Sequence, residues 1–361
     1  MRKIKLLTML IWVLGIISCN TELPAPIVSN FPFEEKWVFN TDNIYSMAAG
    51  DDWLLVSDTK GILALDIADG HVLWRKDYFP YGETGVLMIN NIAYATDSST
   101  VKAFTKSGRE LLSFDLKKPN DSEAQIVTGS DKYILLLRAQ SWNLEVYDLS
   151  TKELLWHQYA GRGGGEVFFN SSSANVYLVN ANSVKAYDIT NGALKWELPG
   201  NFYTSTYNGQ FNLYLFNKQN TSLSDYLGTF ESYDINNQKQ VWSTTFSGRI
   251  HKMNIQGNLL LASTESGILA INSLNGEVVW SALSTEEFYS KPIMVNNIVF
   301  TKGALSKKIY ALTENGVNIG YLQVEREREN GQPYLDYVSG LYKSNETLIV
   351  TTDSKVLAYR P

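Results

Sequence analysis

The stretch that decides the fold is GNLLLASTESGILAINSLNGEVVWSAL, residues 257–283. It contains three short runs, 259–263, 268–272 and 277–282, each of a length and composition typical of a β-strand. Asn275-Gly276 supplies the left-handed backbone that a tight hairpin between the last two strands requires. Because the first two runs are apolar at successive positions, we expect a sheet that is covered on both faces.

The same pattern recurs along the chain, and its copies end at a tryptophan. Full copies close at Trp74, Trp156, Trp196, Trp242 and Trp280, weaker ones carry Ser113 and Tyr321 at that place, and Trp37 stands in phase before them. Successive positions lie 37 to 46 residues apart. A period near 40 with strand-like segments is typical of a β-propeller with one blade per repeat.

The polar residues of the repeat are interpreted as structural. The last turn of a copy opens with Asp66, Asp148, Asp188, Asp234 or Asn272, whose short side chains can accept hydrogen bonds from turn amides. Repetition at this one place favours turn formation over catalysis. The tryptophans are expected to pack on the adjacent blade, with the indole N–H bound to a backbone acceptor.

The two ends of the chain predict how the ring closes. The C-terminal stretch LIVTTDSKVLAYRP (348–361) supplies two strands of a last blade without the outer one, whereas KWVFNTD (36–42) is an outer strand without its own blade. We therefore expect residues near 35–41 to complete the final blade, which removes free sheet edges. The prediction is an all-β, eight-bladed propeller that is closed by its N-terminal strand.

The N-terminus resembles a bacterial lipoprotein signal. Residues 1–18 combine basic residues with an apolar run too short to span a membrane, and they end directly before Cys19, the only cysteine. We expect cleavage and lipidation at Cys19, a tether over 19–32 and one propeller domain over 33–361. The alternative is a secretory signal with a chance cysteine. The expected location is the periplasmic side of the outer membrane, with inner-membrane or surface-exposed placement left open.

Composition and motifs exclude several function classes. The net charge of −6 argues against nucleic acid and against an anionic membrane face as partners, so the lipid on Cys19 is the expected membrane contact. The histidines His71, His157 and His251 belong to different repeats, and metal sites need converging ligands. Neither a nucleophile elbow nor a phosphate loop is present. No catalytic residue, metal or cofactor is predicted.

Three irregular segments mark one rim of the predicted propeller. Segments 161–166, 218–228 and 325–333 all fall where one blade leads to the next or where the second strand leads to the third. Loops on a rigid scaffold commonly carry binding, although such loops can also be merely solvated. The candidate partner-binding residues are Arg162, Tyr203, Tyr226, Glu325, Arg326 and Arg328. Tyr207, Phe288 and Tyr289 are expected near the same rim.

The ALDxxTGxxxW-like repeat, as in ALDIADGHVLW (64–74) and AYDITNGALKW (186–196), resembles that of the pyrroloquinoline-quinone (PQQ) family of eight-bladed propellers. That family contains quinoprotein dehydrogenases, which hold PQQ and calcium and use a disulfide of adjacent cysteines. It also contains non-enzymatic lipoproteins such as BamB of the outer-membrane β-barrel assembly machinery. Cys19 is the only cysteine in this chain, and no calcium-binding set is identified, so the resemblance favours the lipoprotein branch.

That resemblance implies a lipid-anchored scaffold for protein–protein contacts, acting in barrel-protein assembly as a monomer within a complex at the cell envelope. The alternatives are a ligand-binding or sensory propeller, a subunit of another envelope complex, and a PQQ-dependent oxidoreductase.

Overall fold

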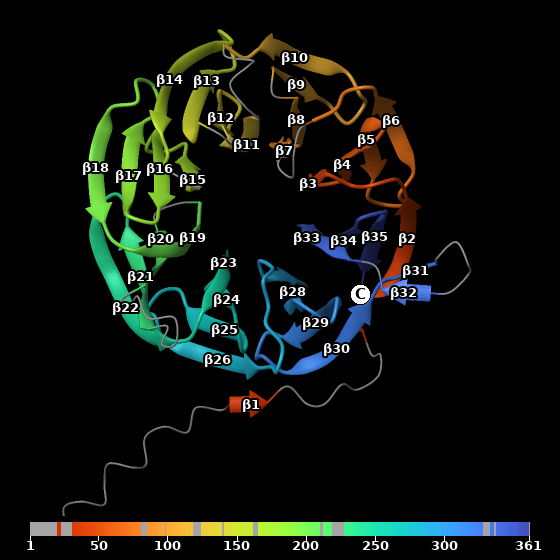
Figure 1. The fold of residues 1–361 in the computed structure, drawn as a ribbon, viewed down its shortest axis with the longest axis vertical. Helices are drawn as coiled ribbons and strands as arrows, with labels where there is room; N and C mark the ends of the chain where they lie inside the picture. Colours follow the sequence, from red (N-terminus) through yellow and green to blue (C-terminus); the bar gives the residue numbers. More distant parts are fainter. Residues whose placement is uncertain are drawn as a thin grey trace, which may run out of the picture.

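The computed structural model describes residues 20–22, 31–80, 85–97, 99–117, 124–138, 141–161, 165–209, 212–218, 227–327, 333–335 and 337–360. Every described element is a β-strand, and Figure 1 shows the strands arranged as a closed ring of eight blades. The all-β, eight-bladed prediction is confirmed. Signal peptide and Cys19 lie outside the described residues.

Each blade is an antiparallel sheet. From the innermost to the outermost strand, blades 1 to 4 are β3 (Ser46–Ala49), β4 (Trp53–Asp58), β5 (Gly61–Asp66), β6 (Val72–Lys76); β7 (Val86–Ile89), β8 (Ile92–Thr96), β9 (Thr100–Phe104), β10 (Glu110–Asp115); β11 (Ala124–Gly129), β12 (Tyr133–Arg138), β13 (Asn143–Asp148), β14 (Glu153–Tyr159); and β15 (Glu166–Asn170), β16 (Asn175–Asn180), β17 (Ser183–Asp188), β18 (Leu194–Pro199).

The second half of the ring continues in the same way. Blades 5 to 8 are β19 (Phe202–Tyr207), β20 (Asn212–Lys218), β21 (Leu227–Asp234), β22 (Lys239–Ser247); β23 (Ile250–Gln256), β24 (Leu259–Thr264), β25 (Gly267–Asn272), β26 (Val278–Leu283); β27 (Ile293–Val295), β28 (Ile298–Lys302), β29 (Lys308–Thr313), β30 (Asn318–Gln323); and β33 (Val338–Ser344), β34 (Thr347–Thr352), β35 (Lys355–Arg360), β2 (Glu34–Asn40). β1 (Asn20–Glu22), within the expected tether, runs parallel to β26, and β31 (Glu325–Glu327) pairs with β32 (Pro333–Leu335).

The burial of each strand follows its place in the blade. Strand β25 is buried at nearly every position, because a neighbouring blade covers each of its faces, whereas the outermost β26 has exposed positions. The three strands of this blade begin and end within one residue of the expected bounds. The core therefore consists of apolar layers between blades, such as Tyr214 and Phe216 of blade 5 against Met253 and Leu260 of blade 6.

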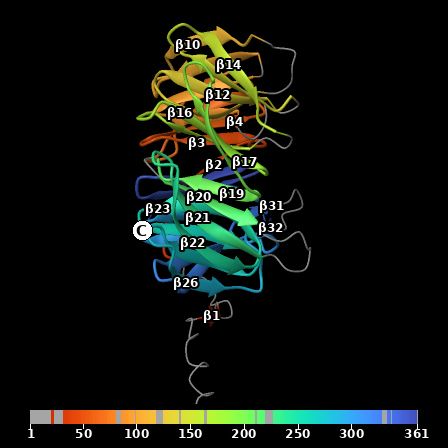
Figure 2. The same cartoon turned by 90° about the vertical axis from the view of Figure 1, so that its left-hand side faces the viewer.

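The disc has two rims with different connections. The turn rim carries the turns between the first and second strands and between the third and fourth, such as 50–52 and 67–71 in blade 1. The connector rim carries the turns between the second and third strands, such as 59–60, and the links from blade to blade, such as 41–45 and 77–80. In the edge-on view of Figure 2, β31 and β32 mark the connector rim and the C-terminus marks the turn rim.

The ring closes as expected, through an antiparallel pairing of the N-terminal β2 with the C-terminal β35. Trp37 lies opposite Ala358, and Phe39 opposite Val356. Blade 8 has no turn between its third and fourth strands, because the two chain ends meet there. The residues just before β2 pack beside it, with Phe33 5.1 Å from Phe300 and Phe31 5.5 Å from Tyr359 between ring centroids. The chain thus enters the propeller at the turn rim.

The repeated tryptophan joins five of the blades to the next one. Trp242 of blade 5 donates its indole N–H to the Ser273 carbonyl of blade 6 at 2.8 Å, and the ring lies on Gly276. Corresponding hydrogen bonds to the next blade are made by Trp37, Trp74, Trp156 and Trp280. Gly276 has φ +77°, and a Cβ there would lie 2.5 Å from the Trp242 ring, so only glycine fits without strain.

The aspartates that open these turns act as expected. Asp66 accepts the backbone N–H of Ala68 at 2.8 Å, and the same contact two residues on is made by Asp148, Asp188, Asp234 and Asn272. Two turns lack the glycine: Lys152 at φ 63° and Gln238 at φ 53°. Lys152 lies in blade 3, and the preceding blade 2 has Ser113 in place of the tryptophan. The Nζ of Lys152 donates to the Ser113 carbonyl at 3.2 Å. At Lys152 the glycine is thus absent from a turn that has no indole ring to accommodate, whereas the Gln238 turn lacks glycine although Trp196 precedes it.

Candidate functional site

Exposed aromatic side chains gather on the connector rim. In the described part of the chain six aromatic residues have more than a third of their surface exposed, with exposed fractions from 46% to 60%. They are Tyr45, Phe79, Tyr159, Tyr203, Tyr289 and Tyr337. All of them lie in, or next to, links from one blade to the following blade. Because aromatic residues supply much of the energy of protein interfaces, this rim is the candidate functional surface.

The other faces of the disc carry aliphatic residues instead. The exposed apolar residues in turns of the turn rim are Leu274 and Val317. On the outermost strands the exposed apolar residues away from the connector-rim end, such as Val72, Leu194 and Val279, are aliphatic too. The concentration of rings on one rim is therefore a feature of that rim and not of the whole surface.

A partly buried carboxylate fixes one part of the connector rim. Glu286, between β26 and β27, accepts the backbone N–H groups of Leu305 at 3.0 Å and Ser306 at 2.6 Å and the Tyr310 hydroxyl at 2.7 Å. Burial alone would raise the pKa of Glu286, but the hydrogen bonds from Ser306, Tyr310 and Leu305 outweigh it and lower the pKa. The turn held in this way presents Leu305 with 90% of its surface exposed. Because the turn is already rigid, a partner that packs on Leu305 would lose little conformational entropy of this chain on binding.

Tyr289 is held against a buried histidine. Its ring meets the His251 ring edge to face, with centroids 4.2 Å apart, and its hydroxyl donates to Glu287. His251, on the innermost strand β23, is 8% exposed, and its Nε2 has no hydrogen-bond partner among the described atoms. Burial lowers the pKa of His251, as does the charge of Arg249, against the opposing effect of Glu287 and Glu265.

The candidate residues that the sequence singled out lie at different places in the structure. Tyr203 lies exposed on β19 at the connector rim, and Glu325 and Arg326 belong to β31 on the same rim. Arg162, Tyr226 and Arg328 lie outside the described residues. Phe288 lies in a link of the connector rim as expected, but it is fully buried, packed on Tyr310, because its backbone pairs with Gly303, so it presents no surface to a partner. The expectation for Tyr207 was wrong. Tyr207 ends β19 at the turn rim, half-buried against Phe168.

Sequence reasoning missed Tyr45, Phe79, Tyr159, Tyr337 and Leu305. A signal for the aromatic ones was present: Tyr159 follows Trp156 by three residues and Phe79 follows Trp74 by five, where an outermost strand has ended. Leu305 offered no such signal, because its exposure depends on the distant carboxylate of Glu286.

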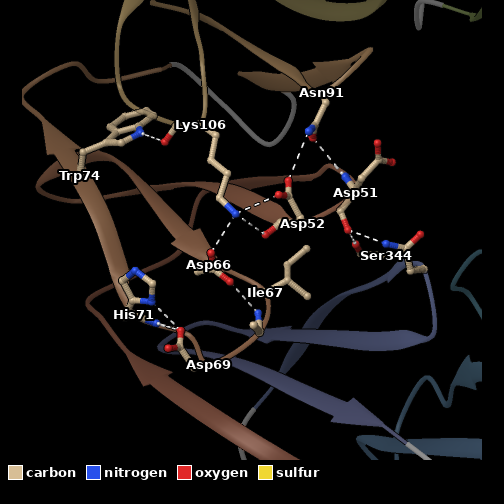
Figure 3. Close-up of polar contacts among 12 residues, drawn as sticks. Asp51, Asp52, Asp66, Ile67, Asp69, His71, Trp74, Asn91, Lys106 and Ser344 are labelled. Atoms are coloured by element: carbon tan, nitrogen blue, oxygen red, sulfur yellow. Dashed lines mark hydrogen bonds and ion pairs between the residues drawn. The ribbon is translucent and has the colours of Figure 1, made fainter.

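Four aspartates of blade 1 cluster on the turn rim and require a separate account. Figure 3 shows Lys106 of blade 2 between Asp52 and Asp66, with Asp69 beside His71 and Asp51 beside Asn91. Lys106 Nζ lies 2.9 Å from Asp52 and 2.8 Å from Asp66, and Asp69 accepts both the backbone N–H and the ring nitrogen of His71. The carboxylates of Asp52, Asp66 and Asp69 are therefore already engaged within the protein, whereas Asp51 is held through its backbone.

Neighbouring blades hold the same turn. The side-chain oxygen of Asn91 in blade 2 accepts the Asp51 N–H at 3.1 Å, and the Ser344 hydroxyl of blade 8 donates to the Asp51 carbonyl at 2.9 Å. The hydrogen bond from Lys106 lowers the pKa of Asp52 and of Asp66. Among the described residues no group of histidine, cysteine and acidic side chains could hold a metal ion. The cluster therefore joins blades 8, 1 and 2 structurally.

Among the residues with a described structure, no helix has the length and apolar character needed to cross a membrane.

Comparison with protein families finds one match. Residues 219–361 fit the family model described as outer membrane protein assembly factor BamB. A sequence comparison with curated proteins finds no match.

Comparison with solved structures supports the fold along the whole ring. The crystal structure of BamB from Moraxella catarrhalis is 14% identical, with a TM-score of 0.66, and the alignment covers 91% of this chain and 100% of that one. The computationally designed Ika8 protein (16% identity, TM-score 0.67, 89% and 97% covered) and Saccharomyces cerevisiae Sqt1 (9%, 0.64, 91% and 97%) are similar as well. At such identities the likeness concerns the fold alone. In sequence over residues 219–361, and in fold over most of its length, the chain is similar to BamB.

Proposed function

We propose that the protein is a non-enzymatic, lipid-anchored scaffold on the periplasmic side of the outer membrane, which binds protein partners through its connector rim in the assembly of outer-membrane β-barrel proteins. The observation that carries the proposal is the gathering of six exposed aromatic side chains on that rim. Tyrosine and phenylalanine provide large contact areas at little entropic cost, which is why they recur as anchors of interfaces.

The likeness to BamB supports the choice of process. The matching family is described as an outer-membrane protein assembly factor, and the BamB crystal structure has the same ring. The cysteine content supports a non-enzymatic role, because Cys19 is the only cysteine and the dehydrogenase branch uses a disulfide of adjacent cysteines.

The connector rim exposes its rings to partners in the periplasm, as Tyr203 and Tyr289 show. Strand β1, which follows Cys19 directly, runs beside β26 with Glu22 opposite Leu283, so the lipid-anchored end starts along the outer edge of blade 6.

Two experiments test the proposal. Membrane fractionation of Cys19→Ser should move the protein from the membrane to the soluble fraction, whereas retention in the membrane contradicts the lipid anchor. Crosslinked cells should yield barrel-assembly subunits with the affinity-purified protein, and the double substitution Tyr203→Ser/Tyr289→Ser should deplete them. Leu274→Ser, an exposed change on the turn rim, is the matched control. Recovery without assembly subunits contradicts the specific role, and equal recovery by all variants contradicts the assignment to the rim.

A further inference from the structure

One part of the connector rim combines aromatic rings with an excess of negative charge. Tyr203 and His251 occupy the second positions of the adjacent innermost strands β19 and β23, and Tyr289 follows in the link to β27. Tyr203 is close enough to the Tyr289 hydroxyl to raise its pKa, after the larger effect of the hydrogen bond with Glu287. Blades 5, 6 and 7 thus each contribute to one cluster.

The charges around this cluster are unequal. The charged groups that act on His251 are Arg249, Glu287 and Glu265. Glu265 also accepts the backbone N–H of Arg249 at 3.2 Å, and Glu287 accepts the Tyr289 hydroxyl. Two carboxylates therefore stand against one guanidinium, and the pKa of the buried imidazole of His251 is lowered by burial and by Arg249.

The rings are placed so that a cation could use them. Tyr203 and Tyr289 are each nearly half exposed, and the edge-to-face contact with His251 fixes the orientation of Tyr289. A cation over the face of a tyrosine is attracted by the ring quadrupole, and carboxylates at the border add to that attraction. The lowered pKa of His251 disfavours a competing positive charge beneath the Tyr289 ring.

We propose that Tyr203, Tyr289, Glu265 and Glu287 form a binding site for a lysine or arginine side chain of a protein partner. This inference rests on the proposed function, of which it specifies one contact. A cationic lipid head group would offer the same chemistry, but the cluster belongs to a rim of exposed aromatic side chains, which are typical anchors of protein interfaces. His251 acts as a positioning residue beneath Tyr289.

A defined probe tests the site on the purified protein. Tyrosines are replaced by 3-fluorotyrosine, and the fluorine signals of residues 203 and 289 are assigned from Tyr203→Phe and Tyr289→Phe. Titration with Nα-acetyl-lysine methylamide should shift both signals saturably, whereas the norleucine analogue, which has the same aliphatic stem without the charge, should not. Added salt should weaken the binding.

Variants separate the two sources of attraction. Glu265→Gln/Glu287→Gln removes the charges, and Tyr289→Leu removes one ring; each should weaken lysine binding by about threefold to fivefold. Leu274→Ala on the turn rim is the control and should bind as the unchanged protein does. Equal shifts with norleucine, no saturable shift with lysine, or unchanged binding by both variants would overturn the inference. If the lysine probe fails while partners still crosslink through the connector rim, this contact is refuted and the proposed function stands; if partners crosslink through the turn rim, the proposed function itself fails.

Discussion

Replacing Gly276 with alanine tests the contact by which the tryptophans join neighbouring blades. The added Cβ would lie 2.5 Å from Cε3 and 2.7 Å from Cδ2 of Trp242, well inside van der Waals contact. The ring has little room to move, because Trp242 is buried and its N–H is bound to the Ser273 carbonyl. Gly209 is a matched control: its φ of +81° is close to the +77° of Gly276, and nothing lies within 4 Å of a Cβ there.

The two substitutions share one cost and differ in another. A left-handed backbone costs a non-glycine residue about 1–2 kcal/mol, which applies to both sites. Overpacking against a fixed ring adds about 1–3 kcal/mol, which applies to Gly276 alone. We therefore expect Gly209→Ala to lower the free energy of unfolding by about 1–2 kcal/mol and Gly276→Ala by about 2–5 kcal/mol.

Urea denaturation followed by tryptophan fluorescence measures both free energies, provided that the slopes with denaturant remain equal. The informative quantity is the difference between the variants, since the backbone cost cancels. A difference near zero would refute the reasoning, because it would mean that the Trp242 ring does not constrain the turn of the next blade.

Two further outcomes follow from the same structure. Gln238→Gly relieves a left-handed residue in the turn of the blade that follows Trp196, and it should raise the free energy of unfolding by about 1 kcal/mol; a loss of stability would contradict the steric account. Burial and Arg249 lower the pKa of His251 in the folded state below 6.5. As the pH falls, the imidazole is therefore protonated in the unfolded chain before it is protonated in the folded one. The free energy of unfolding should fall as the pH drops below 6.5 toward the folded-state pKa. His251→Gln should remove part of this fall in melting temperature, whereas His157→Gln, exposed on the outermost strand β14, should not.

The architecture could be predicted from the sequence because its determinants are local and repeated. Asn275-Gly276 fixes a hairpin by itself, and Asp66 fixes a turn through an amide two residues away. The ring closure was also predictable, because a blade without an outer strand and an outer strand without a blade stand at the two ends, where β2 pairs with β35.

The surface could not be predicted with the same certainty. Phe288 and Tyr289 are adjacent in the sequence, yet one is fully buried and the other half exposed, because the backbone of Phe288 pairs with Gly303, fifteen residues further along the chain. The cluster around His251 draws on three blades, and no spacing along the chain reveals that Glu265 and Glu287 act on the same imidazole. The expected place of Tyr207 failed for a simpler reason: β19 carries the chain from the connector rim to the turn rim.

The central claim is that partners bind the connector rim and not the turn rim. Photocrosslinking residues placed in living cells at 203 and at 274 compare the two rims at exposed positions of one protein. Position 203 should give discrete adducts with envelope proteins, including barrel-assembly subunits, and position 274 should give none. Adducts from position 274 with none from position 203 would contradict the account.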